Sequence, residues 1–368
     1  MSQIPERLRE RLRRAASDAG ARGLGAVVVA PSPDLVYLTG YDPMPFERPT
    51  LLILRPDRDP VLLVPELERP LAAASAAGGL TELHGWIDGV DAYAEVARLL
   101  PAHGAAAVND RVWGVHVLGL QAAAPELDWS SAAPILGALR ARKDADELDA
   151  LRRAGAAADA TFADIVGLPF AGRTEREVAA DLARLLVEHG HRTADFTIVA
   201  GGPNAASPHH EPGERSISGG DVVVLDFGGE LDGYHSDTTR TVVVGEPPEG
   251  FGTVYGFVHA AQEAAVDEVR PGLPIQEVDR VARAVITEGG FGDRFIHRTG
   301  HGIGLEVHEP PYAVEGDDTV LEAGMTFSVE PGIYLPGRFG VRIEDIVAVT
   351  DDGVERLNRS TRELQTVG

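Results

Sequence analysis

The sequence predicts an α+β protein of two domains, a smaller α/β domain followed by a larger one built on a mostly antiparallel sheet. Three observations predict this class. The chain has 368 residues, more than one ordinary core holds and enough for two domains. Helical and strand patterns alternate in the first third, whereas strand patterns dominate from residue 195 onward. A long helical pattern over 138–166 separates the two parts, so we expect domains at 1–136 and 137–368.

The first domain is predicted to alternate helices with short strands. Charges lie on most faces of residues 5–19, which indicates a helix that ends at the glycines following it. Apolar runs at 51–54 and 61–66 are separated by the turn-rich stretch RPDRDP, which predicts a β-hairpin. The other elements expected here are a buried strand at 25–30, helices near 66–77, 92–101 and 113–124, and short strands near 82–86 and 105–109.

The second domain is predicted to contain two pairs of helices and the antiparallel sheet. Alternating charge over 138–166 indicates one long helix. The next helix, 174–190, begins with a capping box formed by Thr174 and Glu177 and stops at Gly190. Two further helices are expected at about 250–269 and 275–289. Strand patterns cover FTIVA, DVVVLDFGG, TTRTVVVG, MTFSVEPGIY and VRIEDIVAVT.

Composition excludes several classes of function. The chain holds 57 Asp and Glu residues against 33 Lys and Arg, so its formal net charge of −24 argues against nucleic acid or an anionic membrane surface as a partner. Cysteine is absent, which excludes disulfides, thiolate nucleophiles and zinc–cysteine sites. The N-terminus lacks the apolar core of a secretory signal, and no apolar run reaches about 18 residues. We therefore expect a soluble cytoplasmic protein whose chemistry rests on carboxylates and histidines.

Two aspartates lie beside runs that should form apolar strands. Asp226 ends a run of four apolar residues, and Asp237 follows 11 positions later, with the turn sequence ELDG between them. A hairpin closed at this turn would place the two carboxylates roughly opposite each other, with Cβ atoms about 4.5–5.5 Å apart. Like charges at that distance repel unless one is protonated or a cation lies between them. The alternative is a loop tip with solvated acids, which the apolar flanks argue against.

Two glutamates near the C-terminus repeat this pattern. Glu330 follows an apolar strand, and Glu344 lies inside another strand 14 residues later. Glutamate is disfavoured in buried strands and is rarely buried without a partner. Arg342 should point to the same face as Glu344, where it is placed to orient a carboxylate. The plain alternatives are outward-facing glutamates and a surface arginine.

Histidines gather in the stretch FIHRTGHGIGLEVHEPP. His297, His301 and His308 lie within 12 positions, and the glycines around His301 allow backbone to approach a site closely. Such a group favours metal ligation or acid–base chemistry over the usual role of a single core histidine. His209 and His210 form a further cluster on an expected loop, where simple solvation of one of them is the alternative.

Together these residues supply the donors of a metal site. Four carboxylates and one imidazole suit two divalent cations such as Mn²⁺, Co²⁺ or Zn²⁺. Two cations offset four negative charges and so remove the repulsion. Metals about 3.5–4 Å apart hold a bridging water, lower its pKa and polarise a carbonyl. The remaining histidines would position substrate and transfer protons.

The blocks that carry these residues resemble a known family. DFGGELDGYHSDTTRT, HRTGHGIGLEVHEPP, FSVEPGIY and GVRIEDI are similar to the signature blocks of the Xaa-Pro peptidases, prolidase and aminopeptidase P. These peptidases belong to the pita-bread superfamily, with methionine aminopeptidase and creatinase. The resemblance extends to PDLVYLTGYD and RKDADELDALRRA, and so covers essentially the whole chain. It implies a small N-terminal creatinase-like α/β domain followed by a pita-bread catalytic domain.

The resemblance also implies roles for individual residues. By this resemblance, Asp237 and Glu344 would bridge two metals. Asp226 would complete one metal site, and His301 and Glu330 would complete the other. A full ligand set argues against creatinase, which has lost it. Glu330 would also carry a proton to the leaving prolyl nitrogen. The other matched active-site residues are His209 for substrate binding, His297, His308 for the scissile carbonyl or the intermediate, and Arg342 just before the last ligand.

One departure from the family concerns the free carboxylate of the substrate. Many prolidases place an arginine shortly after the position of His308, where this chain has Tyr312. Arg48, in the loop YDPMPFERP of the first domain, is a candidate replacement from the same or a neighbouring subunit, and an exposed loop arginine is the alternative.

The resemblance implies an enzyme with two divalent metals, Mn²⁺ first, that hydrolyses the Xaa-Pro bond of small peptides as a homodimer. We expect an Xaa-Pro dipeptidase, because the chain is compact and acyl-side specificity elements are not evident. Three alternatives stay open. They are an aminopeptidase P acting on longer peptides, a hydrolase of another amide or amidino substrate, and a catalytically silent pita-bread scaffold.

Overall fold

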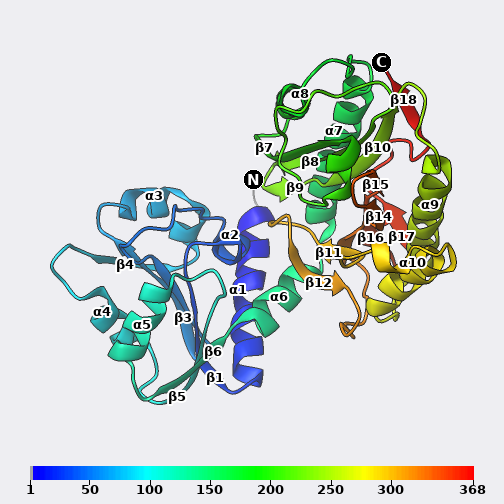
Figure 1. Cartoon of the computed structure of the whole chain (residues 1–368). Helices are drawn as coiled ribbons and strands as arrows, with labels where there is room; N and C mark the ends of the chain where they lie inside the picture. Colours follow the sequence, from blue (N-terminus) through cyan, green and yellow to red (C-terminus); the bar gives the residue numbers. More distant parts are fainter. Residues whose placement is uncertain (1–2) are drawn as a thin grey trace. The chain divides into compact units, whose positions relative to one another are not determined.

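The chain divides into two compact units that each mix helices and sheets. The computed structural model describes residues 3–368, and the division falls after Arg140 (Figure 1). The sequence-based boundary at 136–137 lies inside helix α6 (Ala133–Ala141), a few residues before this division. The expected α+β class, with an α/β unit first, is confirmed.

The first unit is a six-stranded mixed sheet packed against helices. Its strand order is β4-β3-β2-β1-β5-β6, in which β2 runs antiparallel to both neighbours and the other pairs are parallel. The strands are β1 (Leu24–Val29), β2 (Leu51–Arg55), β3 (Arg58–Pro65), β4 (Glu82–Trp86), β5 (Gly104–Val108) and β6 (Leu127–Ser131). The helices are α1 (Gln3–Ala21), α2 (Pro33–Thr39), α3 (Arg69–Ala74), the short η1 (Ala76–Gly79), α4 (Ala92–Leu99), α5 (Gly114–Ala123) and α6.

Most elements of the first unit were predicted, including the hairpin of β2 and β3. Helix α2 and strand β6 were not. Helix α2 has only seven residues, yet it carries clear local signals. The Ser32 hydroxyl accepts from the Leu35 amide, Pro33 stands at the first position, and Gly40 ends the helix at φ 66°. Strand β6 is short and mostly exposed, so it lacks an apolar pattern.

The second unit contains two larger sheets and one two-stranded sheet. The first has the order β18-β10-β8-β7 with β9 on β8, the second β12-β11-β13-β16-β17, and the third pairs β14 with β15. The strands are β7 (Thr193–Gly201), β8 (Val222–Leu231), β9 (Tyr234–His235), β10 (Thr238–Val244), β11 (Gly300–Gly302), β12 (Glu309–Ala313), β13 (Thr326–Val329), β14 (Gly332–Leu335), β15 (Phe339–Arg342), β16 (Asp345–Val349), β17 (Val354–Arg356) and β18 (Gln365–Val367). The helices are α7 (Ala145–Ile165), α8 (Glu175–Glu188), α9 (Phe251–Glu268), α10 (Gln276–Glu288) and the short η2 (Gly202–Ala206) and η3 (Gly292–Arg294).

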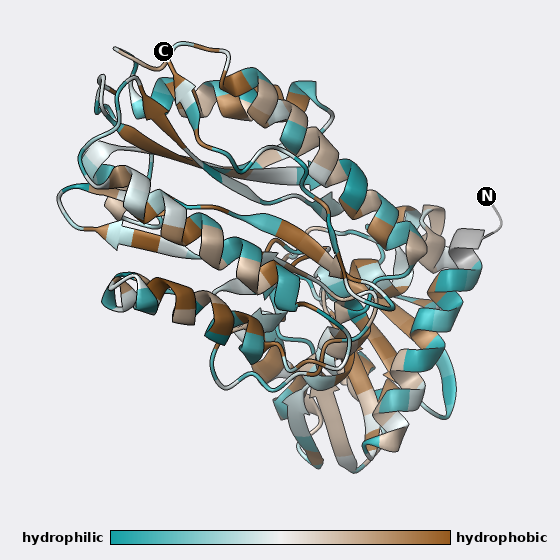
Figure 2. Cartoon of the chain, turned by 90° about the vertical axis from the view of Figure 1, so that its right-hand side faces the viewer, coloured by the Kyte–Doolittle hydropathy of each residue, from teal (hydrophilic) through white to brown (hydrophobic). Residues whose placement is uncertain are grey.

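Each larger sheet has its own hydrophobic core with one helix pair. Apolar residues of α7 and α8 pack against β8 and β10, and those of α9 and α10 pack against β13 to β16. Figure 2 shows teal and brown residues mixed along the helices, as expected for helices with one buried face. The predicted arrangement of two helix pairs on mainly antiparallel strands is confirmed.

Three sequence-based boundaries were wrong. The run MTFSVEPGIY forms two strands, β13 and β14, which belong to different sheets. The expected single helix at 138–166 is two helices, because Asp144 caps the N-terminus of α7 in a capping box with Glu147. Likewise, the run VRIEDIVAV is not one strand. Glu344 lies in the short connection between β15 and β16, and not inside a strand. The capping box of Thr174 and Glu177 on α8 was predicted and is confirmed.

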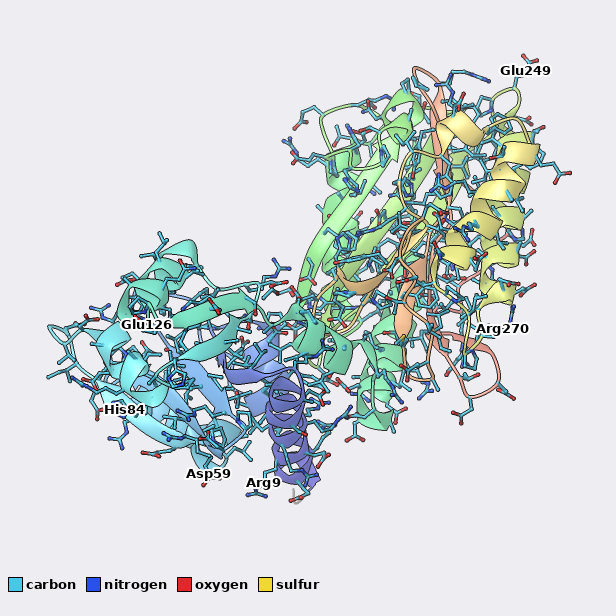
Figure 3. All side chains as sticks on the ribbon, turned by 90° about the horizontal axis from the view of Figure 1, so that it is seen from below. Arg9, Asp59, His84, Glu126, Glu249 and Arg270 are labelled. Atoms are coloured by element: carbon cyan, nitrogen blue, oxygen red, sulfur yellow. The ribbon has the colours of Figure 1, made fainter. Side chains whose placement is uncertain are left out.

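Charged side chains cover the surface of both units. Glu126, Glu249 and Arg270 are exposed, and Figure 3 shows Glu249 extending clear of the ribbon. Ten Asp and Glu residues are buried among those described. Within residues 3–368, no helix has the length and apolar character needed to cross a membrane.

Candidate metal centre

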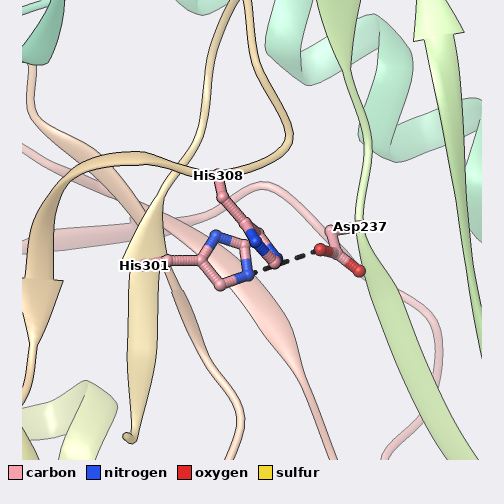
Figure 4. Close-up of side chains that lie close together, drawn as sticks. All are labelled: Asp237, His301 and His308. Atoms are coloured by element: carbon pink, nitrogen blue, oxygen red, sulfur yellow. Dashed lines mark ion pairs between the residues drawn. The ribbon is translucent and has the colours of Figure 1, made fainter. Parts of the chain in front are cut away.

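The second unit gathers the predicted acids and histidines at one place. Three overlapping groups have ligand atoms within 4.8 Å of one another. The groups are Asp226, Asp237 and Glu344; His301, Glu330 and Glu344; and Asp237, His301 and His308. Figure 4 shows the last group, in which both imidazoles face the Asp237 carboxylate. Asp237, His301 and Glu344 each belong to two groups, so the three groups form one continuous cluster.

The strand register brings the two aspartates together diagonally. Asp226 on β8 lies opposite Thr239 on β10, and Asp237 precedes Thr239 by two residues. The two aspartates were expected roughly opposite each other, and the observed register places them two positions apart. Because side chains alternate along a strand, an offset of two keeps both carboxylates on one face. Their oxygens still come within 4.8 Å.

The glycines around His301 serve strand packing. A Cβ atom on Gly300 would lie 1.8 Å from the Ser328 carbonyl oxygen, and one on Gly302 would lie 2.4 Å from that of Pro310. Strand β11 can therefore press against both of its neighbours only with glycine at these positions. From the sequence, these glycines were expected to let backbone approach the site. In the structure they instead allow close contact between neighbouring strands.

The carboxylate cluster has unsatisfied oxygens. Asp226 Oδ1, Asp237 Oδ1 and Glu344 Oε1 are buried and accept no hydrogen bond from any described residue. Most other buried acids of the chain meet an arginine, lysine or histidine, as Glu309 meets Lys143 at 2.7 Å. Buried oxygens without donors are costly, and divalent cations bind such oxygens. The donor set therefore fits two metals.

Burial and mutual repulsion shift the pKa values of these acids. Burial, together with the charges of Glu344 and Asp226, raises the pKa of Asp237 well above its ordinary value. Burial and the charges of Glu330 and Asp226 do the same to the pKa of Glu344. The pKa of Glu330 rises to about 7, mainly through burial. Without cations the cluster cannot keep all of its negative charge, which supports the same conclusion.

The imidazoles are held neutral and ready to act as ligands. Burial lowers the pKa of His301 to about 3 and, with the nearby charge of His308, keeps its ring uncharged. Its Nδ1 lies 3.1 Å from the Gly302 carbonyl oxygen, so Nδ1 carries the proton. The lone pair of Nε2 therefore faces Asp237 Oδ2 at 3.6 Å and Glu330 Oε1 at 3.4 Å.

Further side chains orient the acids. Arg342 Nη2 donates to Asp226 Oδ2 at 2.5 Å, and the Thr239 hydroxyl donates to Glu344 Oε2 at 2.6 Å. Arg342 thus orients Asp226 and not Glu344, its neighbour in sequence. Such contacts fix the carboxylates in the orientation that ligands need.

Arg342 is also linked to His297 through Tyr334. Arg342 Nη1 donates to the Tyr334 hydroxyl at 2.8 Å, and this hydroxyl lies 2.8 Å from His297 Nε2. Nδ1 of His297 lies 2.7 Å from the Arg298 carbonyl oxygen, so both ring nitrogens are engaged. Burial lowers the pKa of His297 to about 4. Tyr334 was not predicted from the sequence, because nothing in the run FSVEPGIY distinguishes this tyrosine from an ordinary strand residue.

A cavity of about 660 Å³ opens onto the acidic cluster. His209 and His308 line it and are exposed, whereas His210 turns away to Glu175 at 2.8 Å. Glu175 also accepts from the Gly201 and Gly213 amides, and so holds the loop that carries His209. Glu175 was missed as well, since in sequence it reads only as a first-turn helix acid. The rest of the lining comprises Asp195, Phe196, Ile198, Pro208, Val307, His297, Arg298 and Arg342.

The fold and the site together define a metal-dependent hydrolase. Residues 149–351 match the model of metallopeptidase family M24, and residues 9–142 match that of the creatinase/prolidase N-terminal domain. The chain belongs to metallopeptidase family M24, and the resemblance to the pita-bread Xaa-Pro peptidases is confirmed.

Known proteins are similar to the chain over nearly its whole length. It is 45% identical over 360 residues to the probable dipeptidase PepE of Mycobacterium bovis, covering 97% of this chain and 96% of that protein. It is 38% identical to an Xaa-Pro dipeptidase of Lactobacillus delbrueckii subsp. lactis, covering 94% and 95%. The crystal structure of dipeptidase PepE from Mycobacterium ulcerans matches with a TM-score of 0.96 and 43% identity, covering 99% of both chains.

Proposed function

We propose that this enzyme is an Xaa-Pro dipeptidase, which cleaves the bond before proline in dipeptides. The observation that carries the proposal is the buried carboxylate cluster at the cavity of about 660 Å³, a volume suited to a small peptide. Relatives with the names dipeptidase and Xaa-Pro dipeptidase support the choice of substrate. The peptide bond before proline has no N–H, so its cleavage suits a dedicated enzyme.

The five residues that would hold the metals are Asp226, Asp237, His301, Glu330 and Glu344. Asp237 and Glu344 would be shared between the two metals, because each belongs to two of the three close groups and each carboxylate offers two oxygens, whereas His301 offers a single free nitrogen. Two bound divalent cations supply an activated water and polarise the peptide carbonyl. The oxygen-rich donor set supports Mn²⁺ as the metal. We also propose a cytoplasmic location and a homodimer, in line with the family resemblance and the absence of cysteine.

The residues around the metals then divide the remaining work. Glu330, at the edge of the cavity, would take a proton from the attacking water and deliver it to the prolyl nitrogen. His308 would donate a hydrogen bond to the carbonyl oxygen as negative charge develops there. His209, on the loop held by Glu175, would contact the bound peptide.

The decisive experiment compares three substrates after loading with Mn²⁺, Co²⁺ or Zn²⁺. The substrates are an Xaa-Pro dipeptide, an Xaa-Pro-Xaa tripeptide and a dipeptide without proline. We expect the highest kcat/KM for the Xaa-Pro dipeptide and the highest rate with Mn²⁺. Faster cleavage of the tripeptide would instead identify an aminopeptidase P, and no cleavage by the metal-loaded protein would identify a silent scaffold.

The role of His308 leads to a separate prediction. His308→Ala should lower kcat by about 10²–10³-fold, as expected when one donor to a developing oxyanion is lost. Metal content, measured by mass spectrometry, should stay that of the wild type, although His308 lies close to Asp237 and His301. His259→Ala on α9 is the matched control and should change neither quantity. Loss of metal from the His308 variant would show that His308 is a ligand.

A further inference from the structure

The cavity contains one arginine that has no acidic partner. Two arginines line it, Arg298 and Arg342. Arg342 is buried and engaged by Asp226 and Tyr334. Arg298 is half-buried, and within residues 3–368 its guanidinium forms no ion pair with a carboxylate. Arg298 is therefore the cation in this lining that is available to a ligand.

Tyr312 holds the Arg298 guanidinium in a defined place. The guanidinium carbon lies over the Tyr312 ring, 4.5 Å from its centroid. Tyr312 itself pairs with His301 across strands β11 and β12, so the ring is anchored next to the metal-binding histidine. A guanidinium stacked on a ring keeps its N–H groups free in its own plane. This fork matches the two oxygens of a carboxylate.

The position of Arg298 places its charge at the catalytic end of the cavity. The residue precedes His301 by three positions. Arg298 and His308 line the same cavity, together with the acids of the carboxylate cluster. Arg48, by contrast, donates to Asp88 at 3.0 Å through both Nε and Nη2, and also to Glu47.

We propose that Arg298 binds the free carboxylate of the dipeptide and thereby selects dipeptides over longer peptides. This inference rests on the proposed Xaa-Pro dipeptidase function and names the residue that sets its specificity. In an Xaa-Pro dipeptide the proline carries the terminal carboxylate, whereas in a longer peptide a neutral amide takes its place. Five acidic residues line the same cavity, so a substrate carboxylate needs an unengaged cation to be held there.

The experiment compares an Xaa-Pro dipeptide with the same dipeptide amidated at its C-terminus. For the dipeptide, Arg298→Ala should raise KM by about 10- to 100-fold, the effect expected for loss of a hydrogen-bonded ion pair. Its kcat and its metal content should remain those of the wild type. The amidated dipeptide should be cleaved equally by wild type and variant. The wild type should favour the free dipeptide, and the variant should lose this preference.

Three further variants separate binding from structure. Arg298→Lys should restore part of the affinity, because it keeps the charge without the fork. Tyr312→Phe should behave as the wild type, whereas Tyr312→Ala should raise KM for the free dipeptide alone. Arg294→Ala removes an exposed arginine four residues earlier and is the matched control, with no expected change.

The possible outcomes are distinguishable. The Arg298 inference is wrong if Arg298→Ala changes KM for both substrates equally or for neither. It is also wrong if Arg48→Ala raises KM for the free dipeptide and Arg298→Ala does not. In both cases the dipeptidase function stands. If the metal-loaded wild type cleaves an Xaa-Pro bond in neither substrate, the proposed function itself is wrong, and the inference is wrong with it.

Discussion

Asp237→Asn is expected to abolish metal binding and activity together. Asp237 shares one close group with Asp226 and Glu344 and another with the histidines, so its loss weakens both proposed metal sites. An amide has one weaker acceptor oxygen and no charge to offset a cation. We expect kcat/KM for an Xaa-Pro dipeptide to fall by about 10³-fold or more, since several kcal/mol of transition-state stabilisation are lost. Steady-state kinetics and metal analysis of the purified variant measure both effects.

The same variant should be more stable than the wild type when both lack metal. Burial and the charges of Glu344 and Asp226 raise the pKa of Asp237, which reports unfavourable charge in the metal-free cluster. Replacing that carboxylate by an amide removes the repulsion, so Tm of the metal-free variant should rise. In the wild type, metal at about 100 times its Kd should raise the free energy of unfolding by about 3 kcal/mol, and the variant should lack this gain.

Asp195→Asn is the matched control for Asp237→Asn. Asp195 lines the same cavity, but His235 lies 2.7 Å from its Oδ2 and it belongs to none of the close groups. This control should retain its metals. Retention of metal and activity by Asp237→Asn would overturn the assignment of the ligands.

Lys143→Met is expected to have the largest effect on stability. Lys143, the single lysine of the sequence, lies 2.7 Å from Glu309, and the two side chains are 1% and 2% exposed. Removing the ammonium leaves the Glu309 carboxylate buried without this ion pair, and the free energy of unfolding should fall by about 3–5 kcal/mol. For a unit of this size that corresponds to a Tm lower by about 6–20 °C in calorimetry. Activity should fall as well, because Glu309 follows His308 directly.

Two comparisons test this interpretation. Arg142→Met removes a neighbouring arginine whose pair with Glu322 is half exposed, so it should cost at most about 1 kcal/mol. Combining Lys143→Met with Glu309→Gln removes both charges and should recover much of the lost stability. Equal stability of the Lys143 and Arg142 variants would contradict a large role for the buried pair.

Local signals explain why several elements could be predicted from the sequence. The capping box of Thr174 and Glu177 and the turn RPDRDP act within a few residues, so no tertiary contact is needed to read them. The failures have equally local causes. The alternating charge pattern continues across residues 142–144 and so concealed the N-terminus of α7, which Asp144 caps. Helix α2 is too short to show a periodic pattern.

The candidate site was predictable in its residues but not in its connections. Acids beside apolar strands and histidines in one short stretch indicated two metals, because buried like charges require cations. Tyr334 and Glu175 carried no such signal, since their roles depend on partners 8 and 35 residues away.

The sequence by itself determined the kind of chemistry, because the number and types of buried donor groups limit what they can bind. Tertiary structure alone decided how those groups are used. The pairing of β8 with β10 set the offset of Asp226 and Asp237, and Arg298 reached Tyr312 because β11 and β12 lie side by side. Register and packing join residues distant in sequence, and a change of one position turns a side chain to the other face.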